Sequence, residues 1–512
     1  MWSQYEVCVK AILPLLLASL TFLWLRRTAK NSKELPPGPR GLPLVGYLPF
    51  LGTDLHKEFT KLATIYGPIY KFWLANKLCI VINSPSLVKE VVRDHDTIFA
   101  NREPMVAATV VSFGAEDIAF RAYSPEWNKL RKIFVREMLS KSMLDNLYPL
   151  RKEQVKKSIG HVYENIGKPV DVGNLAFLTA IKSIVSMTCG ASFEEGKMSI
   201  DEGEIKKTAG ELMVLLGKPN VSDIFPALAW FDLQGVEKDA KRVTRVFEGL
   251  LESAIQQRES EMVAGENGGR IRKDFMQFLL ELHQNQDGES SLTKTQLKGL
   301  LIDIVVGGTD TTATTVEWAM AELLKKPEML NKVQQELTKV VGSNKQVEES
   351  HLSQLTYLQA VIKETFRLHP PLPLLVPRRP IQSTTVGGYK VPEGSKVFLN
   401  IGAIQRDPSV WENPLEFRPE RFLESGNVGK FDLAGNNFGF LPFGSGRRGC
   451  PGISLADRML KYMMASFLHL FEWKLEDGAD LELLDRFGIV VKTKEPVVAI
   501  PTPRFSNLDL YA

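Results

Sequence analysis

The sequence Phe-Gly-Ser-Gly-Arg-Arg-Gly-Cys-Pro-Gly, at residues 443–452, is the most informative segment of this chain. Its glycines at positions 444, 446 and 449 allow tight turns and a close approach of the backbone to a flat ligand. An apolar residue then recurs every four positions, at Leu455, Met459, Met463 and Phe467. This spacing predicts a helix that begins just after Cys450. Because unpaired N–H groups and the helix dipole favour a thiolate at a helix N-terminus, we expect Cys450 to be a thiolate that can bind iron.

The spacing of five residues in this segment resembles that of the haem-binding loop of the cytochrome P450 family. The matching positions are Phe443, Gly446, Arg448, Cys450 and Gly452. The resemblance implies that Cys450 is the axial ligand of a heme b iron. It also implies that Arg448 hydrogen-bonds a haem propionate and that Phe443 shields the sulfur from water. A single cysteine is more often a small buried apolar residue, but five matching positions in ten favour the haem interpretation.

A second chemical signature lies at residues 302–318, where the apolar spacing predicts a helix. Two glycines and five threonines make this composition poor for a straight helix; they are Gly307, Gly308, Thr309, Thr311, Thr312, Thr314 and Thr315. Threonine hydroxyls can bond to the preceding turn and open space for a ligand against the backbone. Residues 307–312 resemble the oxygen-activation motif of the same family, which implies that Asp310 and Thr311 relay protons in catalysis. The alternative is that these residues only pack the helix.

Glu364 and Arg367 are three residues apart, so they are neighbours on one face of a predicted helix. Such a pair is common on exposed helices and has little meaning alone. Here the sequence His369-Pro370-Pro371 ends the helix, and Phe-Arg-Pro-Glu-Arg-Phe follows at residues 417–422. This order resembles the structural triad of the family. It implies that Arg421 joins Glu364 and Arg367 in holding the cysteine loop.

Three further residues match positions at which family members contact the haem propionates. Trp127 and Arg131 are four residues apart and therefore share a helical face, and Arg378 follows a proline in a predicted strand. The other basic residues of the Trp127 helix are Lys129, Lys132 and Arg136. Their charges could steer an acidic redox partner to the cysteine side of the haem, although an ordinary solvated face explains them equally well.

The candidate substrate pocket is nearly all apolar. By its position in the chain, the segment at residues 102–125 matches the family's loop over the distal haem face, with an ordinary surface loop as the alternative. The candidate lining residues are Phe113, Phe120, Leu212, Met213, Leu216, Ile304, Val305, Leu375, Val376 and Ile489. Such a lining argues against a sugar or an amino acid as the substrate. We predict a small apolar plant specialised metabolite, first a terpenoid, with a flavonoid or another phenolic or alkaloid as the alternative.

The 512 residues have an ordinary globular composition, with 44% hydrophobic and 24% charged residues and a formal net charge of +3. This small charge gives no indication of nucleic-acid binding. The four cysteines are scattered, at Cys8, Cys79, Cys189 and Cys450. They are too few for a disulfide framework, which suits a reducing compartment.

Residues 7–25 form an apolar run in which Lys10 is the only charge, and this run is long enough to span a bilayer. The basic residues that follow it, Arg26, Arg27 and Lys30, predict that the rest of the chain is cytoplasmic. No small-x-small cleavage site follows, so a signal peptide is the weaker alternative. We therefore expect a membrane anchor at residues 1–27, a basic, proline-rich hinge at residues 28–45 and a catalytic domain at residues 46–512.

The resemblance covers nearly the whole chain and implies a mainly α-helical cytochrome P450 fold with a small β region. Two runs of loosely alternating residues within 66–82 predict a β-hairpin in that region. The implied enzyme is a monooxygenase of the endoplasmic reticulum membrane that inserts one oxygen atom from O2 into its substrate. Its electrons come from NADPH through a membrane-bound NADPH-cytochrome P450 reductase. Two alternatives stay open: a haem-thiolate isomerase or dehydratase, and a membrane haem carrier or sensor in which Asp310 and Thr311 have no role.

Overall fold

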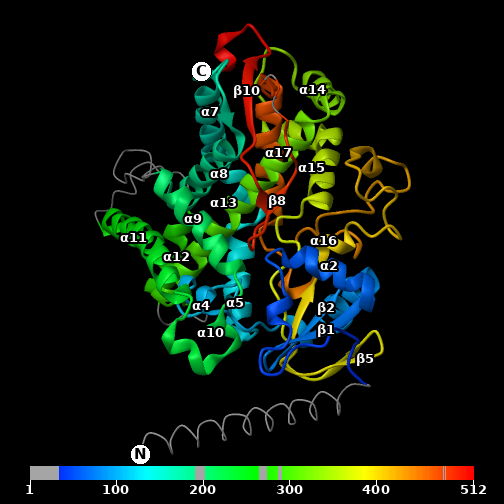
Figure 1. Ribbon diagram of the computed structural model, residues 1–512. Helices are drawn as coiled ribbons and strands as arrows, with labels where there is room; N and C mark the ends of the chain where they lie inside the picture. Colours follow the sequence, from blue (N-terminus) through cyan, green and yellow to red (C-terminus); the bar gives the residue numbers. More distant parts are fainter. Residues whose placement is uncertain are drawn as a thin grey trace, which may run out of the picture.

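The computed structural model describes residues 34–190, 202–263, 274–285, 291–476, 478 and 480–511. This part of the chain is mainly helical, and the sheet that contains β1 and β2 lies to one side of the helices (Figure 1). The expected fold class is therefore confirmed. The predicted anchor at residues 1–27 and the first part of the predicted hinge lie outside the described residues, so both stay predictions.

The helical part is built around α13 (Lys294–Leu324), which runs through the centre of the molecule (Figure 1). Its start is fixed by a capping box, in which Thr293 Oγ1 accepts from the Gln296 N–H and the Gln296 side chain accepts from the Thr293 N–H, both at 3.1 Å. From Thr309 onward almost every residue of α13 is buried, as expected of a helix packed on all sides. The helix predicted at residues 302–318 is confirmed.

The described residues form further helices, some packed around α13 and some beside the sheet of β1 and β2 (Figure 1). They are α2 (Leu55–Tyr66), α3 (Pro85–Lys89), α4 (Val106–Val111), α5 (Pro125–Ile133), α6 (Lys141–Asn146), α7 (Tyr148–Glu164), α8 (Val172–Cys189), α9 (Glu202–Gly217), α10 (Val221–Ile224), α11 (Val236–Val263), α12 (Phe275–Gln284), α14 (Pro327–Val341), α15 (Thr356–Leu368), α16 (Ile401–Ile404) and α17 (Ile453–Leu470). Within the described ranges, α8 is the one helix long and apolar enough to cross a membrane. It is mostly buried and packs along α13, so it is a core helix of this fold.

The predicted hairpin is formed by β1 (Ile69–Leu74) and β2 (Lys77–Ile82), and β6 (Lys396–Leu399) pairs with β2 in parallel. Residues 78–82 of β2 are all buried, which is typical of a strand covered on both faces. Alternate residues of β2 enter two different apolar clusters. Phe59 of α2 packs in one of these clusters, so α2 covers one face of the sheet.

The other strands form three small sheets. They are β3 (Val170–Asp171), β10 (Val498–Pro503) and β7 (Phe471–Lys474) in that order, then β4 (Thr384–Val386) with β5 (Tyr389–Val391), and β8 (Asp485–Arg486) with β9 (Lys492–Thr493). All of these pairs are antiparallel. The turn between β8 and β9 reaches α9, where the Ile489 N–H donates to the Met213 carbonyl at 3.2 Å.

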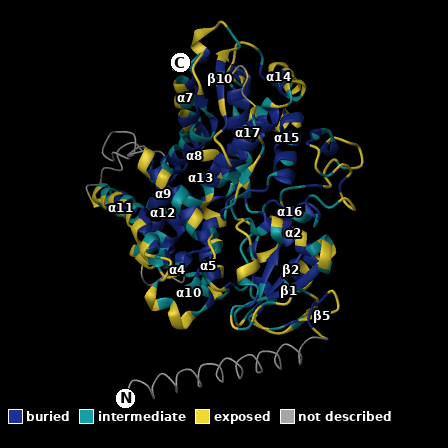
Figure 2. Ribbon diagram, in the orientation of Figure 1, coloured by how far each residue is buried: buried dark blue, intermediate teal, exposed yellow. Residues whose placement is uncertain are grey.

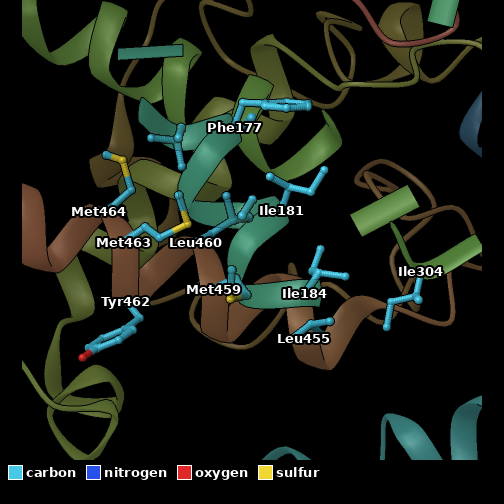
Figure 3. Close-up of a cluster of buried hydrophobic side chains, with 14 of the residues drawn as sticks. Phe177, Ile181, Ile184, Ile304, Leu455, Met459, Leu460, Tyr462, Met463 and Met464 are labelled. Atoms are coloured by element: carbon cyan, nitrogen blue, oxygen red, sulfur yellow. The ribbon is translucent and has the colours of Figure 1, made fainter. Parts of the chain in front are cut away.

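The main apolar core lies where α17, α8 and α13 meet, and buried residues dominate this region (Figure 2). In Figure 3, Leu455 and Met459 of α17 lie beside Ile184 of α8, with Ile304 of α13 nearby. The four-residue spacing after Cys450 is therefore confirmed as the buried face of a helix. This core supports the segment that carries Cys450.

Candidate active site

A cavity of about 320 Å³ lies between α13, α9, the segment before α5 and the cysteine segment. Eight of the predicted pocket residues lie on its wall, namely Phe120, Leu212, Met213, Leu216, Ile304, Leu375, Val376 and Ile489. Phe113 and Val305, which were also predicted, do not lie on this wall. Phe113 lies in a turn with a positive φ of 53°, and its ring packs against the Lys298 ammonium at 5.5 Å. Val305 lies on another face of α13, because successive residues of a helix point about 100° apart.

The cysteine segment is held in a tight turn. The Cys450 N–H donates to the Phe443 carbonyl at 2.8 Å, and Gly444 and Gly446 have φ values of 68° and 71°. These positive values favour glycine, and a Cβ on Gly446 would lie only 2.4 Å from the Val92 carbonyl oxygen. Cys450 faces the cavity, and α17 begins at Ile453, as the sequence predicted.

The expected thiolate preference of Cys450 is not found in the protein alone. Burial raises the pKa of the Cys450 thiol, and the Gly452 N–H, 3.3 Å from Sγ, and the Arg131 guanidinium lower it by less. One N–H at the start of α17 reaches the sulfur, and the protein atoms around the cavity disfavour its charged form, although Cys450 is itself exposed to the cavity. A bound metal ion would favour the thiolate, since a thiol must lose its proton to bind a metal.

Phe443 lies on the cavity wall beside the cysteine segment. Its ring meets the Phe366 ring edge-on, with 5.1 Å between the ring centroids. This contact fixes the Phe443 ring next to the backbone that turns back to Cys450. The position suits the predicted shielding of the sulfur.

Arginines gather on one part of the cavity wall. Arg131, Arg378 and Arg448 were predicted there, and Arg102 was not. Each guanidinium donates to at least one backbone carbonyl, and these acceptors are Gly449 for Arg131 (2.7 Å), Ser445 for Arg378 (2.7 Å), Ala100 for Arg448 (2.6 Å) and Val376 for Arg102 (2.7 Å). Arg102 lies at the start of a loop with no distinctive spacing, so nothing in the sequence could single it out.

The charges of these arginines are not fully compensated by acids. Burial lowers the pKa of Arg378 to about 10, and burial together with the neighbouring Arg378 lowers that of Arg448 to about 9. Burial and the charges of Arg448 and Arg378 hold the pKa of Arg102 well below its usual value. Positive groups in this arrangement favour an anionic ligand.

Haem fits the donors on this wall. Arg378 Nη1 and Arg102 Nε are buried and have no hydrogen-bond partner among the described residues, which is a costly state unless a ligand supplies an acceptor. A ligand with carboxylate groups can satisfy these donors through charge-assisted hydrogen bonds. Cys450 offers a metal ligand on the same cavity, and most of the remaining wall is apolar.

Trp127 does not reach the cavity wall, contrary to the expected propionate contact. It lies on α5, where the Ser124 side chain caps the helix by accepting from the Trp127 N–H at 3.1 Å. Its indole Nε1 donates to the Ile118 carbonyl at 2.9 Å, and its ring stacks 4.2 Å from the Arg448 guanidinium. Trp127 therefore supports Arg448 through a cation–π contact from behind.

Thr311 and Asp310 point in different directions from α13. Thr311 lies on the cavity wall, and its hydroxyl donates to the Gly307 carbonyl at 2.7 Å. Asp310 is buried away from the cavity, with Oδ1 2.5 Å from the Lys492 ammonium of β9. Its Oδ2 has no hydrogen-bond partner among the described residues. Burial raises the pKa of Asp310, and the Lys492 charge opposes this only in part.

Two carboxyl groups that the sequence analysis missed also reach the cavity wall, Asp117 and Asp303. Asp303 of α13 accepts from the Ile118 N–H at 2.7 Å, and Asp117 accepts from the Phe120 N–H at 3.1 Å. Burial raises the pKa of Asp117 to about 6. Burial, together with the nearby charge of Asp117, raises the pKa of Asp303 well above its usual value. The pair joins the loop over the cavity to α13.

The predicted triad is assembled in the protein interior. Arg367 donates from Nε to Glu364 Oε2 at 2.6 Å and from Nη2 to Oε1 at 2.8 Å, and Arg421 Nε donates to Oε1 at 3.0 Å. Glu364 and Arg367 are 0% exposed, so this is a fully desolvated ion-pair network. It differs from the exposed helical pair that the sequence spacing alone suggests.

Gln405 connects this triad to the cysteine segment. Arg367 Nη1 donates to the Gln405 carbonyl at 3.0 Å, and the Gln405 side chain accepts from the Leu441 N–H at 2.8 Å. Leu441 lies two residues before Phe443, so the hydrogen bonds lead from the triad to the start of the cysteine segment. A single glutamine in a helix end has no sequence signature, and it could not have been predicted.

The comparisons with known proteins agree with this arrangement. A family model described as cytochrome P450 matches residues 36–500. The chain is 36% identical over 506 residues to a 3,9-dihydroxypterocarpan 6A-monooxygenase of Glycine max, covering 97% of this chain and 98% of that protein. It is 37% identical over 479 residues to a flavonoid 3'-monooxygenase of Petunia hybrida, covering 92% of each. A solved zebra fish cytochrome P450 with abiraterone matches with a TM-score of 0.73 at 27% identity, covering 88% of this chain and 99% of that one.

Proposed function

The chain belongs to the cytochrome P450 family of haem monooxygenases, and we propose that it oxidises a small, largely apolar phenolic substrate in the cavity beside Cys450. Bound haem supplies the activation of O2, with electrons that come from NADPH through a reductase. The observation that carries the proposal is that Cys450, four arginines and Thr311 border one cavity whose remaining wall is mostly apolar.

In this proposal each group on the wall has one task. Cys450 binds the haem iron, and Arg102, Arg131, Arg378 and Arg448 bind the haem carboxylates. Their backbone hydrogen bonds hold the guanidiniums in place before the ligand arrives. Binding the haem therefore requires little reorganisation of these side chains.

Protons reach the cavity through α13. The Thr311 hydroxyl donates to the Gly307 carbonyl, so its oxygen can accept a hydrogen bond from the cavity side. Asp310 is the next residue toward the surface, since its partner Lys492 is partly exposed to solvent. We assign Asp310 the uptake of protons and Thr311 their delivery. The raised pKa of Asp310 makes proton uptake easier for this carboxylate than for an exposed aspartate.

The relatives favour a phenolic substrate over the terpenoid expected from the sequence. The Glycine max and Petunia hybrida proteins are named for a dihydroxypterocarpan and a flavonoid, which are phenolic molecules. Asp117 and Asp303 also give the cavity wall polar groups that a hydrocarbon could not use. The terpenoid stays the second candidate, because residues such as Leu212, Ile304 and Val376 make most of the wall apolar.

An exposed apolar surface supports attachment to a membrane. The segment between α10 and α11, which contains the 3-10 helix η6 (Pro226–Phe231), exposes Leu228, Trp230, Phe231 and Leu233, and Trp230 is 82% exposed. Figure 2 shows exposed residues around α10 at this end of the molecule. Contiguous exposed apolar residues of this kind mark interaction sites. With residues 1–27 as an anchor and 28–45 as a hinge, we assign the enzyme to the endoplasmic reticulum membrane, with the catalytic domain at 46–512 in the cytoplasm beside its reductase.

The first experiment is the absorbance difference spectrum of microsomes that contain the expressed protein, reduced and exposed to carbon monoxide. A long-wavelength Soret band is expected, and Cys450→Ala should remove it. Cys189→Ala is the matched control, because Cys189 lies outside the cavity wall and should leave the band unchanged. A band that survives Cys450→Ala would exclude Cys450 as the iron ligand.

The substrate is tested by incubating these microsomes with a reductase, NADPH and separate flavonoid and terpenoid mixtures. Products one oxygen heavier are expected from the flavonoid mixture. Products from the terpenoid mixture alone would leave the enzyme class intact and overturn the phenolic proposal. A chain that functioned as a haem carrier or sensor would give no product from either mixture.

A further inference from the structure

Asp96 contacts Arg447 of the cysteine segment, which lies 351 residues further along the sequence. It follows the π-helical turn η2 (Glu90–Asp94). Its two carboxylate oxygens accept from the Arg447 N–H at 3.1 and 3.2 Å, and Oδ2 pairs with Arg447 Nε at 3.3 Å. The Asp96 side chain is 19% exposed and that of Arg447 is 47% exposed, so the carboxylate is mostly covered while water still reaches the contact.

The contact leaves no space between the carboxylate and the backbone of the segment. A Cβ built on Gly446 would lie 2.5 Å from Asp96 Oδ1. Gly446 also has a φ of 71°, which turns the Arg447 N–H toward the carboxylate. Asp96 therefore restrains the segment at Gly446 and Arg447, three to four residues before Cys450.

Asp96 also faces one of the arginines of the cavity wall. Arg378 Nη1 lies 3.6 Å from Asp96 Oδ1, close enough for an ion pair but too long for a hydrogen bond. The other terminal nitrogen of Arg378, Nη2, donates to the Ser445 carbonyl at 2.7 Å. Nη1 consequently keeps a free donor, with its charge partly balanced by Asp96.

We infer that Asp96 is a positioning residue for haem, which fixes the cysteine segment through Arg447 and holds Arg378 with one donor free for a haem carboxylate. This inference rests on the proposed function, because it requires haem in the cavity. The negative charge of Asp96 has a second consequence. A negative charge beside Arg378 of the cavity wall favours the more positive, oxidised form of a bound haem, so removing the Asp96 charge should raise the reduction potential, by an amount that the pairing with Arg447 and Arg378 reduces.

Two substitutions separate the charge of Asp96 from its hydrogen bonds. Asp96→Asn keeps an oxygen that can accept from the Arg447 N–H but removes the charge, whereas Asp96→Ala removes both. Asp94→Asn is the matched control, because Asp94 is exposed and lies two residues away, at the end of η2. The three variants and the wild type are purified with haem. Their reduction potentials are measured by dye-coupled titration, and their rates of haem loss by transfer to apomyoglobin.

Asp96→Asn is expected to raise the reduction potential and to keep the long-wavelength carbon monoxide band. Asp96→Ala is expected to lose haem about tenfold faster, which corresponds to about 1.4 kcal/mol, and to shift part of the band to short wavelength. Asp94→Asn should match the wild type in every measurement. Asp96 variants that keep the wild-type potential and rate of haem loss, even at reduced thermal stability, overturn the inference. A wild type without the long-wavelength band would instead overturn the proposed function itself.

Discussion

Replacing Glu364 with glutamine tests whether the buried triad holds the cysteine segment. The Glu364 carboxylate accepts hydrogen bonds from Arg367, from Arg421 and from the Arg418 N–H at 2.8 Å. A glutamine of the same shape offers one acceptor oxygen, and its amide NH2 faces donors that it cannot satisfy. The substitution also removes the carboxylate that joins both buried arginines.

The size of the effect follows from this burial. Breaking a fully buried ion pair by removing one partner costs about 3–5 kcal/mol. The entropy of unfolding is about 2.1 cal/mol/K per residue, or about 1 kcal/mol/K for 512 residues. Glu364→Gln should therefore lower the unfolding temperature by about 3–5 °C. Because Gln405 links Arg367 to Leu441, the variant should also lose haem faster than the wild type.

The assay follows circular dichroism and Soret absorbance of the purified protein during heating. Glu58→Gln is the control, since Glu58 pairs with Lys61 at 2.7 Å where the Lys61 side chain is 71% exposed. Such a surface pair is worth about 0–1 kcal/mol, so its loss should shift the midpoint by about 1 °C at most. A Glu364→Gln midpoint equal to that of Glu58→Gln would refute the energetic argument. A lower midpoint with an unchanged rate of haem loss would refute the link through Gln405.

Three further predictions address proton delivery, the tight turn and acid stability. Thr311→Ala should keep haem but lower product formation on the order of 10²-fold and divert NADPH electrons into hydrogen peroxide; unchanged coupling would remove Thr311 from the mechanism. Gly446→Ala should lower the free energy of unfolding by the roughly 1–2 kcal/mol that a positive φ costs, and further through a clash with the Val92 carbonyl. Gly342→Ala, at φ 87° in open space, should show only the cost of the positive φ. Equal losses of unfolding free energy in the two variants would contradict the close approach at Gly446. Burial alone would raise the pKa of Asp485, but hydrogen bonds from His56 and Lys57 lower it to about 2. The ionised Asp485 side chain therefore stabilises the folded protein by about 2 kcal/mol above pH 3.8, and this contribution is lost as the pH falls toward 2. In denaturant titrations, Asp485→Asn should be less stable than the wild type at pH 6 and should match it near pH 2.

The sequence by itself determined the parts of the site that depend on short-range spacing. The turn at 443–452, the helix that follows it, the helix at 302–318 and the hairpin at 66–82 all follow from local patterns, because glycine conformations and helical or strand periods are properties of neighbouring residues. The grouping of Cys450 with the triad came from matching motif order to a known family. The anchor at residues 1–27 and the roles of individual site residues remain predictions.

The tertiary structure alone decided which way side chains point and what surrounds them. A period of 3.6 residues predicts that a helix has a buried face, but it does not say whether that face meets a cavity or another strand. The sequence therefore could not exclude Val305 from the cavity wall or show that Asp310 lies beside Lys492. Arg102, Gln405 and Asp96 reach the site across long sequence separations and have no local pattern. Even the thiol of Cys450 illustrates this limit: its position before a helix suggested a lowered pKa, but burial in the folded chain raises it. Desolvation is set by every segment that packs around a group, and that information exists only once the chain has folded.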